Sequence, residues 1–178
     1  MVSPTVPSPV VDIGFFSQVP IFAGLPEWVL IRVVRVARLV VLEDDQPLFG
    51  EGHQARSMFV VREGAVEILK QGRNGAEFCV AQLKVGDCVG EMSLVDIQPR
   101  SASARARGAA RLYAFDQAQV AKLYETDLEA YALLVLNVAR VLSRRLRSAD
   151  QLLVDAGMAI EGLANIGAED SDEGAGGG

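Results

Sequence analysis

The sequence predicts a mainly β domain with flanking helices, of the sandwich, barrel or roll kind. Between residues 38 and 116, short apolar runs alternate with glycines, a pattern typical of strands joined by tight turns. The segments on either side of this region have the apolar spacing of helices instead. At 178 residues, the chain is long enough for one domain with a sizeable core and too short for two.

The region before the strands contains two candidate helices. Residues 1–12 are rich in Pro, Ser and Val and are expected to form a disordered leader. A short helix is expected to start between Asp12 and Phe16. Pro26 suits the first position of a second helix, where a missing N–H costs nothing. The apolar positions of that helix include Trp28, which is therefore expected in the core.

Two turns and two cysteines are the informative features of the strand region. The run FVVREGAVEIL predicts a hairpin with its turn at Glu63 and Gly64, and GRNGAE at residues 72–77 predicts a second, exposed turn. Cys79 and Cys88 lie in apolar, strand-like runs. Buried reduced thiols are expected there rather than a disulfide.

After the strands, the apolar period becomes helical again. Asp116 is expected to cap a short helix over residues 117–125. Thr126 and Glu129 form a capping-box signature for a second helix, which lacks Gly and Pro as far as Ala156. A single apolar stripe on this helix would pack on the strands, whereas a wider apolar face favours pairing with a second copy. The width of the apolar face favours a homodimer.

The charge is placed unevenly along the chain. Residues 1–147 hold 16 acidic and all 17 basic residues, whereas residues 148–178 hold seven acidic residues and no basic ones. Residues 157–178 are therefore expected to form an acidic, Gly-rich, disordered tail. An acidic end repels nucleic acid and supplies no basic recognition helix, so no DNA partner is expected. The RRLR cluster at Arg144–Arg147 is interpreted as a solvated helix face.

Several classes of protein are excluded or disfavoured. No window approaches the ~18–20 apolar residues of a membrane span, and the N-terminal residues lack the basic start of a signal peptide. A cytoplasmic protein is therefore expected. His53 is the one histidine of the chain, which excludes a metal site built on histidines. It lies in a turn, where solvent exposure is expected. No nucleophile lies beside a base, so neither a catalytic site nor an enzyme is expected.

Residues 89–106 carry the chemistry of a small-ligand site. Gly90 lets the backbone approach an anion, because it has no Cβ. Glu91 supplies an acceptor-only carboxylate, and residues 92–95 suit a single helical turn whose free N–H groups attract a phosphate. Arg100 offers a planar fork of donors that matches phosphate oxygens. A carboxylate for a diol and an arginine for a phosphate predict a ribose phosphate as the ligand.

The same two charged residues have a second interpretation. Glu91 and Arg100 also suit an ordinary ion pair across a surface loop, which would stabilise the fold by ~0–1 kcal/mol. Gly90 would then serve a plain turn. The strand-like runs on either side favour the ligand site.

The run from Val89 to Ser103 resembles the phosphate-binding cassette of the cyclic nucleotide-binding domain family, which includes bacterial cyclic AMP receptor proteins and regulatory subunits of cyclic AMP-dependent protein kinase. The matching positions are Val89, Gly90, Glu91, Met92, Ser93, Leu94, Pro99, Arg100, Ser101, Ala102 and Ser103. The resemblance covers roughly residues 15–150 and implies one cyclic nucleotide-binding domain at 13–156. Within it, the family has a double-stranded, jelly-roll-like β-roll, expected here over about 38–116, with C-terminal helices over about 117–156.

The resemblance also implies roles for individual residues. It implies that Glu91 binds the ribose 2′-hydroxyl and that Arg100 binds the exocyclic phosphate oxygens. Backbone amides would complete the phosphate site, from Gly90, Met92, Ser93 and Ala102. The ligand-binding set further includes Val89 and Ser101. Polar contacts to the base are expected from the C-terminal helix, where the candidates are Ser148, Asp150 and Gln151.

Cyclic AMP is the ligand that the resemblance implies. Bacterial cyclic AMP receptors carry a serine after the arginine, as Ser101 does here, whereas kinase domains selective for cyclic AMP carry Ala and those selective for cyclic GMP carry Thr. Cyclic GMP therefore stays open, and no cofactor or metal is expected. The favoured function is a receptor whose ligand closes the C-terminal helix and so regulates an unidentified protein partner. The alternative is an interaction or dimerisation module that kept the β-roll without ligand binding.

Overall fold

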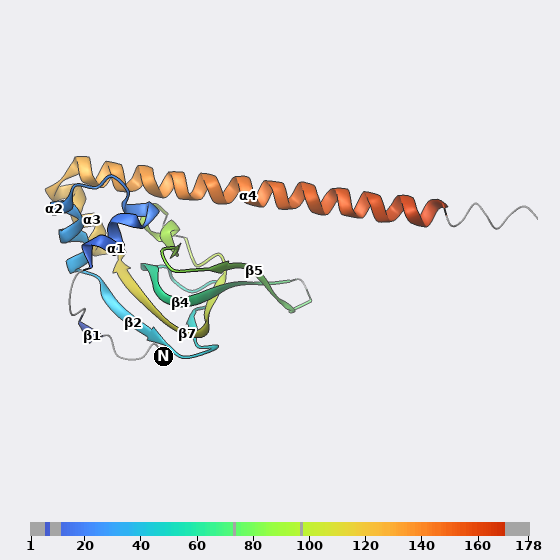
Figure 1. Cartoon of the computed structure of the whole chain (residues 1–178), viewed down its shortest axis with the longest axis horizontal. Coiled ribbons are helices and arrows are strands. Elements are labelled where there is room, and N and C mark those ends of the chain that lie inside the picture. The colour runs from blue at the N-terminus through green and yellow to red at the C-terminus, as the bar shows by residue number, and fades with distance from the viewer. Residues whose placement is uncertain (1–5, 8–11, 73, 97, 170–178) are drawn as a thin grey trace, which may run out of the picture. The chain divides into compact units, whose positions relative to one another are not determined.

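The computed structural model describes residues 6–7, 12–72, 74–96 and 98–169 (Figure 1). The chain divides into two compact units, one that ends at Val138 and one that begins at Ala139. The first unit holds the strands and the shorter helices. Helix α4 (Leu128–Glu169) begins in the first unit and makes up the described part of the second.

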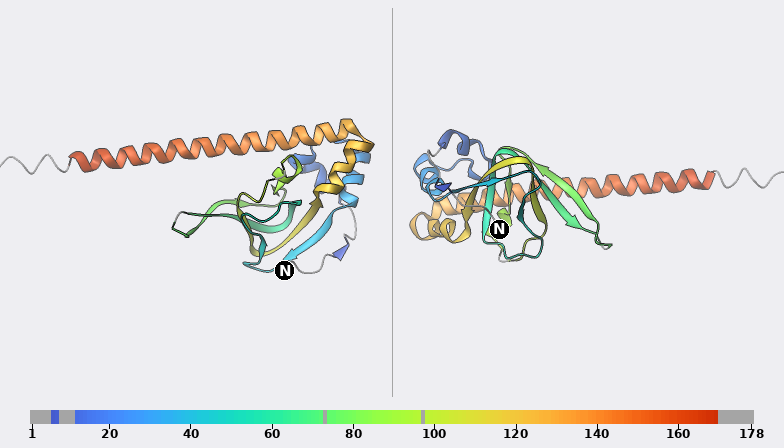
Figure 2. Two further views of the ribbon diagram at one scale, coloured as in Figure 1. Left: turned by 180° about the vertical axis from the view of Figure 1, so that it is seen from behind. Right: turned by 90° about the horizontal axis from the view of Figure 1, so that it is seen from below.

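The first unit is built on one antiparallel sheet. Within the described residues it has seven strands in the order β1-β2-β7-β4-β5, with β3 paired to β7 and β6 paired to β4. The strands are β1 (Val6–Pro7), β2 (Arg38–Leu42), β3 (Pro47–Phe49), β4 (Ser57–Gln71), β5 (Glu77–Leu83), β6 (Cys88–Val89) and β7 (Ser103–Asp116). The long strands β4 and β7 pair along most of their length and curve together (Figure 2). This arrangement confirms the mainly β fold class with flanking helices.

Short helices precede, interrupt and follow the strands. They are α1 (Ile13–Gln18), the 3₁₀ helix η1 (Pro20–Phe22), α2 (Glu27–Arg35), the 3₁₀ helix η2 (Glu91–Leu94) and α3 (Gln117–Thr126). Helices α1, α2 and α3 gather at one end of the strands (Figure 1). Helix α1 starts within the expected range, and Asp12 caps it, since its Oδ1 accepts a hydrogen bond from the N–H of Phe15 at 2.9 Å.

Two helix starts differ from the sequence expectation. Asp116 precedes α3, but its carboxylate accepts hydrogen bonds from an arginine of β2 and a serine of β4 and does not cap the helix. At the start of α4, Oδ1 of Asp127 accepts a hydrogen bond from the N–H of Ala130 at 3.0 Å. Asp127 therefore caps α4, and the capping box predicted at Thr126 is wrong. The Thr126 hydroxyl donates back into the last turn of α3 instead.

The core lies between the curved strands. Its buried apolar side chains are Val40, Leu42, Leu48, Val61, Val66, Leu83, Val89, Ala104, Ala106, Ala110, Leu112 and Ala114. Three partly buried side chains, Phe49, Phe59 and Ile68, pack against them. A second cluster is aromatic and packs α1 and η1 against β7. Its rings, with contacting centroids 4.8–5.9 Å apart, belong to Phe16, Phe22, Tyr113 and Phe115. Burial of this apolar surface is the main driving force for folding.

Asn137 ties the beginning of α4 to η1. Its side chain is buried, and its Nδ2 donates hydrogen bonds to the carbonyls of Ile21 at 3.2 Å and Ala23 at 2.7 Å. One carbonyl within η1 and one just after it thereby gain a hydrogen-bond donor, which a buried carbonyl requires. The sequence does not predict this contact, because the partners of Asn137 are backbone carbonyls distant along the chain.

Trp28 is not a core residue, contrary to the sequence expectation. Its side chain is 52% exposed, and the guanidinium of Arg32 lies over its ring at 5.2 Å from the centroid. The buried side of α2 consists of Val29, Leu30, Val33 and Val34. Apolar residues surround most of this helix, so periodicity alone does not show which side faces the strands.

The hairpin predicted at Glu63 and Gly64 is also wrong, because β4 runs through both residues as one strand. The pairing with β7 shifts register on either side of Glu63, so the glycine marks a bulge and not a turn. Gly64 has a φ of +76°, and a Cβ there would lie 2.3 Å from the carbonyl oxygen of Ala109. Only glycine allows β4 and β7 to approach this closely.

The exposed turn predicted at residues 72–77 is confirmed. It joins β4 to β5, and the resulting hairpin extends beyond the other strands (Figure 1).

Cys79 lies on β5 and is exposed, so the expectation of burial is wrong for this residue, whereas Cys88 on β6 is buried. Cys79 and Cys88 are not joined by a disulfide. The difference arises because β5 ends the strand order of the sheet and has a neighbour on one side.

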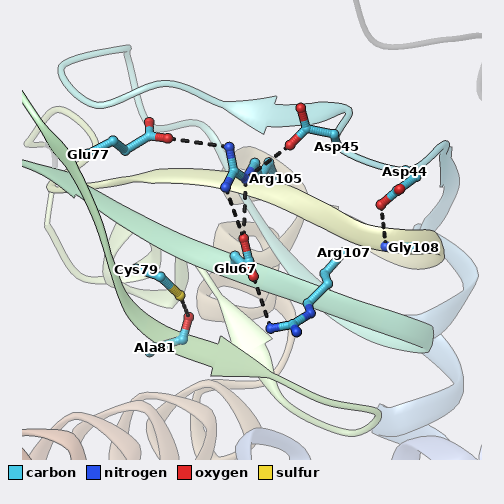
Figure 3. A network of polar contacts seen from close by, with 9 residues as sticks. All are labelled: Asp44, Asp45, Glu67, Glu77, Cys79, Ala81, Arg105, Arg107 and Gly108. Atoms are coloured by element: carbon cyan, nitrogen blue, oxygen red, sulfur yellow. Dashed lines mark hydrogen bonds and ion pairs between the residues drawn. The ribbon is translucent and has the colours of Figure 1, made fainter.

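A charge network crosses the outer side of the sheet (Figure 3). Glu67 on β4 accepts hydrogen bonds from Arg105 and Arg107 of β7, each at 3.2 Å. Arg105 also pairs with Asp45 at 3.2 Å and with Glu77 of β5 at 3.4 Å. The hydrogen bond to Glu67, more than the neighbouring charges, raises the pKa of Arg105. The network therefore links the loop after β2 to β7, β4 and β5.

The boundaries expected from composition shift at both ends. Strand β1 lies within the expected leader and pairs with β2. Helix α4 continues past Ala156 to Glu169, into the expected acidic tail. Asp12, the last residue of the expected leader, caps α1, and residues 1–5, 8–11 and 170–178 lie outside the described residues. Among the helices that the structure describes, none is long and apolar enough to cross a membrane.

Candidate functional site

The candidate site begins where β6 ends. Strand β6 pairs with β4, and Val89 lies opposite Phe59. This pairing fixes the position from which the chain enters the site. Gly90 then adopts a left-handed conformation, with φ +74°, directly before the first residue of η2. A residue with a Cβ pays a steric cost in this conformation. The glycine thus turns the chain inward, and Glu91 is 2% exposed as a result.

The missing side chain of Gly90 makes room for Arg100. A Cβ on Gly90 would lie 2.1 Å from Nη1 and 3.1 Å from Cζ of Arg100, and 3.2 Å from the carbonyl oxygen of Ser57. The guanidinium therefore lies directly against the glycine backbone. From the sequence, Gly90 is expected to let the backbone approach a ligand anion; in the structure it also lets Arg100 approach the backbone.

Arg100 is held inside the protein. Its side chain is 8% exposed. Nη2 donates a hydrogen bond to the carbonyl of Ser57 at 2.6 Å, and Nη1 makes a longer one to the carbonyl of Gly90 at 3.4 Å. The guanidinium carbon lies 4.1 Å from the ring centroid of Phe49 and 5.8 Å from that of Phe59. Nε is buried and has no hydrogen-bond acceptor within the described residues.

Burial and a neighbouring carboxylate act in opposite directions on Arg100. Burial lowers the pKa of the guanidinium, because a charge is poorly solvated inside a protein. The negative charge of Glu91 raises the pKa of Arg100 and so offsets part of this effect. The two side chains thus lie in one electrostatic environment. Both are buried, whereas an ordinary pair across a surface loop would be exposed.

Helix η2 places Glu91 at its first position. The N–H of Ser93 donates to the carbonyl of Gly90 at 3.1 Å, and the Ser93 hydroxyl donates to the same carbonyl at 2.7 Å. This double contact closes the single turn that the sequence predicts after Gly90. Glu91 is the first residue of that turn, where a negative charge meets the positive end of the peptide dipoles.

The loop after β3 holds the backbone of Arg100 by hydrogen bonds. The N–H of Arg100 donates to the carbonyl of His53 at 2.8 Å, and the N–H of Gly52 donates to the carbonyl of Arg100 at 2.9 Å. Lys70 of β4 pairs with Glu51 at 2.5 Å and also contacts the carbonyl of Ser101. Backbone and side chain of Arg100 are therefore both fixed by neighbouring segments.

The predicted site residues are divided between the two units of the chain. Val89, Ser93 and the charged pair are buried, Ala102 is half-buried, and Met92 and Ser101 are exposed. The three candidates for base contacts, Ser148, Asp150 and Gln151, belong to the second unit and are exposed. Their contact with a base therefore stays a prediction.

The groups that contact the guanidinium of Arg100 are not predicted from the sequence. Phe49, Phe59 and the carbonyl of Ser57 come from β3 and β4, which are distant from the cassette along the chain. A backbone carbonyl leaves no signal in a sequence. The two phenylalanines do appear in the strand pattern, but that pattern predicts burial and not a neighbour.

The chain is similar to known proteins over most of this region. Residues 39–127 match the profile of the family described as "Cyclic nucleotide-binding domain". The chain is 35% identical over 133 residues to the cyclic AMP receptor protein of Thermus thermophilus, which covers 74% of this chain and 59% of that protein. It is 31% identical over 94 residues to a cAMP-dependent protein kinase regulatory subunit of Yarrowia lipolytica, which covers 53% of this chain and 24% of that protein. The chain spans less than two thirds of both relatives.

Solved structures agree on the fold. The crystal structure of the Thermus thermophilus catabolite activator protein is similar with a TM-score of 0.64 and 32% identity, over 75% of this chain and 61% of that one. A cyclic nucleotide-binding domain from Methylobacillus flagellatus is similar with a TM-score of 0.71, over 79% of this chain and 84% of that one. At 19% identity, the second likeness concerns the fold alone.

Proposed function

Because the chain belongs to the cyclic nucleotide-binding domain family, we propose that it binds a cyclic nucleotide in the cassette of Gly90, Glu91 and Arg100. The observation that carries this proposal is Nε of Arg100, a buried donor with no acceptor within the described residues. A buried donor left in this state costs ~1–3 kcal/mol. A bound ligand that supplies an acceptor there recovers this free energy.

A phosphate fits this requirement in both charge and shape. Burial disfavours the charged form of Arg100, and a phosphate monoanion would supply the missing counter-charge. Nε and one terminal nitrogen form a flat pair of donors, which suits two oxygens of the same phosphate. Nη2 already donates one hydrogen bond to the carbonyl of Ser57, and Nε is the buried donor that has no acceptor within the described residues.

Glu91 is the proposed acceptor for the sugar. Its carboxylate is buried, and it lies one residue after the glycine that faces Arg100. A carboxylate accepts hydrogen bonds and donates none, so it favours a hydroxyl over a second phosphate. A ribose that bears a cyclic phosphate carries both groups within one small ligand. The pair Glu91 and Arg100 therefore supports a cyclic nucleotide better than inorganic phosphate.

The identity of the base is proposed from Ser101. In bacterial cyclic AMP receptors a serine follows the arginine, so cyclic AMP is the proposed ligand and cyclic GMP the alternative. A thermal-shift panel of cyclic AMP, cyclic GMP, linear AMP and cyclic di-GMP tests this choice, because a ligand that binds the folded state raises the melting temperature. The largest rise is expected with cyclic AMP. No rise with any of the four would favour a module that kept the fold without ligand binding.

Arg100→Ala tests the central residue. Binding of cyclic AMP should weaken by about 2–4 kcal/mol, since a desolvated phosphate loses its charged partner. Arg107→Ala is the matched control, because Arg107 lies on β7 with a 61% exposed side chain and pairs with Glu67 on the outer side of the sheet. Calorimetry that gives equal affinities for Arg100→Ala and Arg107→Ala would rule out the role of Arg100.

Helix α4 is the proposed dimer contact. Leu146 and Leu153 are 63% and 72% exposed, and their separation of seven residues puts them on one face of the helix. We infer that a second copy covers this face. Sedimentation velocity should show a dimer, and the double variant Leu146→Glu/Leu153→Glu should be monomeric. Arg144→Glu, a change outside this stripe, should leave the dimer intact, and a wild-type monomer would contradict the inference.

The proposed output is regulation of a protein partner through α4. A ligand shifts a conformational equilibrium when it binds one state more tightly than the other. Hydrogen exchange of α4 amides with and without cyclic AMP measures this directly. A change in protection along α4 is expected, and identical exchange in both states would remove the proposed coupling.

A further inference from the structure

The guanidinium of Arg100 lies on two phenylalanine rings. We propose that Phe49 and Phe59 are positioning residues, which hold Arg100 in place for the phosphate and thereby set the affinity for the nucleotide. The affinity part of this proposal rests on the proposed function. The positioning part concerns the ligand-free protein and is tested separately.

The two rings form a rigid support. Phe49 ends β3 and Phe59 lies on β4, and their centroids are 6.0 Å apart with an interplanar angle of 31°. Both side chains pack against the buried core cluster of the sheet. Since the core fixes the rings and the rings carry the guanidinium, the position of Arg100 is set by the packing of the sheet.

The rings act together with two backbone groups. The ring centroid of Phe49 lies 4.1 Å from Cζ of Arg100. The backbone of Gly90 is also close, since a Cβ on Gly90 would lie 3.1 Å from this Cζ. The carbonyl of Ser57 holds Nη2. These contacts restrain both the plane of the guanidinium and its rotation within that plane. Nε is the donor that remains without an acceptor in the described residues.

An aromatic support suits a phosphate site better than a carboxylate would. The face of a ring attracts a cation but accepts no strong hydrogen bond, so it leaves Nε of the guanidinium to the ligand. A carboxylate in direct contact would occupy those donors and would have to be displaced. Among the ion pairs between described residues, none includes Arg100. The rings therefore stabilise the charge without competing for it, and the site is ordered before the ligand binds.

The first test is made without any ligand. Protons above an aromatic face resonate upfield, so the Nε–Hε signal of Arg100, assigned by its loss in Arg100→Lys, should be shifted upfield in the wild-type protein. Phe49→Leu removes the nearer ring and should move this signal toward that of a free arginine. Phe49→Tyr keeps an aromatic face and should leave it in place. Phe78→Leu, a change at a 54% exposed phenylalanine on β5, should have no effect.

The second test is the affinity for cyclic AMP, measured by calorimetry on the same variants. Phe49→Leu should bind roughly ten- to thirtyfold more weakly, as expected for a lost cation–π contact in a desolvated site. Phe49→Tyr and Phe78→Leu should bind as the wild type does. Phe59→Leu should act in the same direction with a smaller effect, because its ring is farther from the guanidinium.

The two measurements separate the positioning role from the proposed function. An unchanged Nε–Hε signal in Phe49→Leu overturns the positioning role, whatever happens to the affinity. A shifted signal with wild-type affinity overturns the link to the ligand. If the wild-type protein binds no cyclic nucleotide, the proposed function fails, and the Nε–Hε signal still decides whether the rings position Arg100. Should Phe49→Leu not fold, Phe59→Leu decides both questions.

Discussion

Gly90→Ala is a small change that should disable the site. The left-handed φ of +74° costs an alanine ~1–2 kcal/mol relative to glycine. The new Cβ would also lie 2.1 Å from Nη1 of Arg100, so the guanidinium has to leave its place. Its hydrogen bond to the carbonyl of Ser57, 2.6 Å long, is then lost. A hydrogen bond from a charged group contributes ~1.5–3 kcal/mol, so the total loss of stability should be about 2.5–5 kcal/mol.

Gly75→Ala is the matched control for this prediction. Gly75 has a φ of +78°, and a Cβ there meets nothing within 4 Å. Alanine at position 75 therefore has the same backbone cost of ~1–2 kcal/mol, without any contact with Arg100. Urea denaturation of both variants gives the difference in the free energy of unfolding, and calorimetry with cyclic AMP gives the effect on binding.

The refuting result follows from the same comparison. If Gly90→Ala loses no more stability than Gly75→Ala and binds cyclic AMP as tightly as the wild type, Arg100 does not need the space at Gly90. The close contact between the glycine and the guanidinium would then have no functional consequence.

Three further predictions concern the scaffold. Gly64→Ala should lower the free energy of unfolding by about 3 kcal/mol or more, because its Cβ would lie 2.3 Å from a backbone oxygen of β7; an effect below that of Gly75→Ala would contradict the bulge. Asn137→Leu should cost about 2 kcal/mol in urea denaturation, since two carbonyls lose their donor, and a neutral effect would show that the contact is dispensable. The hydrogen bond from Lys70 lowers the pKa of Glu51 in the folded protein. The contact therefore contributes its full stability above the ordinary carboxyl pKa, and this contribution is lost as the pH falls through the lowered pKa. Lys70→Met should return the carboxyl pKa to its ordinary value in an NMR titration, and an unchanged titration would assign the shift to another group.

The sequence anticipated the local parts of the site. A glycine, a carboxylate and an arginine in a short segment carry a chemical signature that does not depend on distant residues. The structure brings Gly90, Glu91 and Arg100 together as that signature requires, and η2 forms where a single helical turn is expected. Local spacing was sufficient because the residues of the cassette are neighbours along the chain.

The errors arise where long-range packing decides the outcome. A glycine between two apolar runs indicates a turn or a bulge equally well, and only the pairing of β4 with β7 makes Gly64 a bulge. Trp28 and Cys79 sit in apolar patterns, but one faces outward from α2 and the other lies on the last strand of the order. Phe49 and Phe59 were missed for the same reason, since their role depends on which segment packs over them.

A crystal structure of the protein with cyclic AMP tests the account most directly. We expect a phosphate oxygen within hydrogen-bond distance of Nε of Arg100, the ribose 2′-hydroxyl on the carboxylate of Glu91, and the guanidinium still on the ring of Phe49. A nucleotide bound elsewhere, or an Arg100 side chain that turns away from the phosphate, would contradict it.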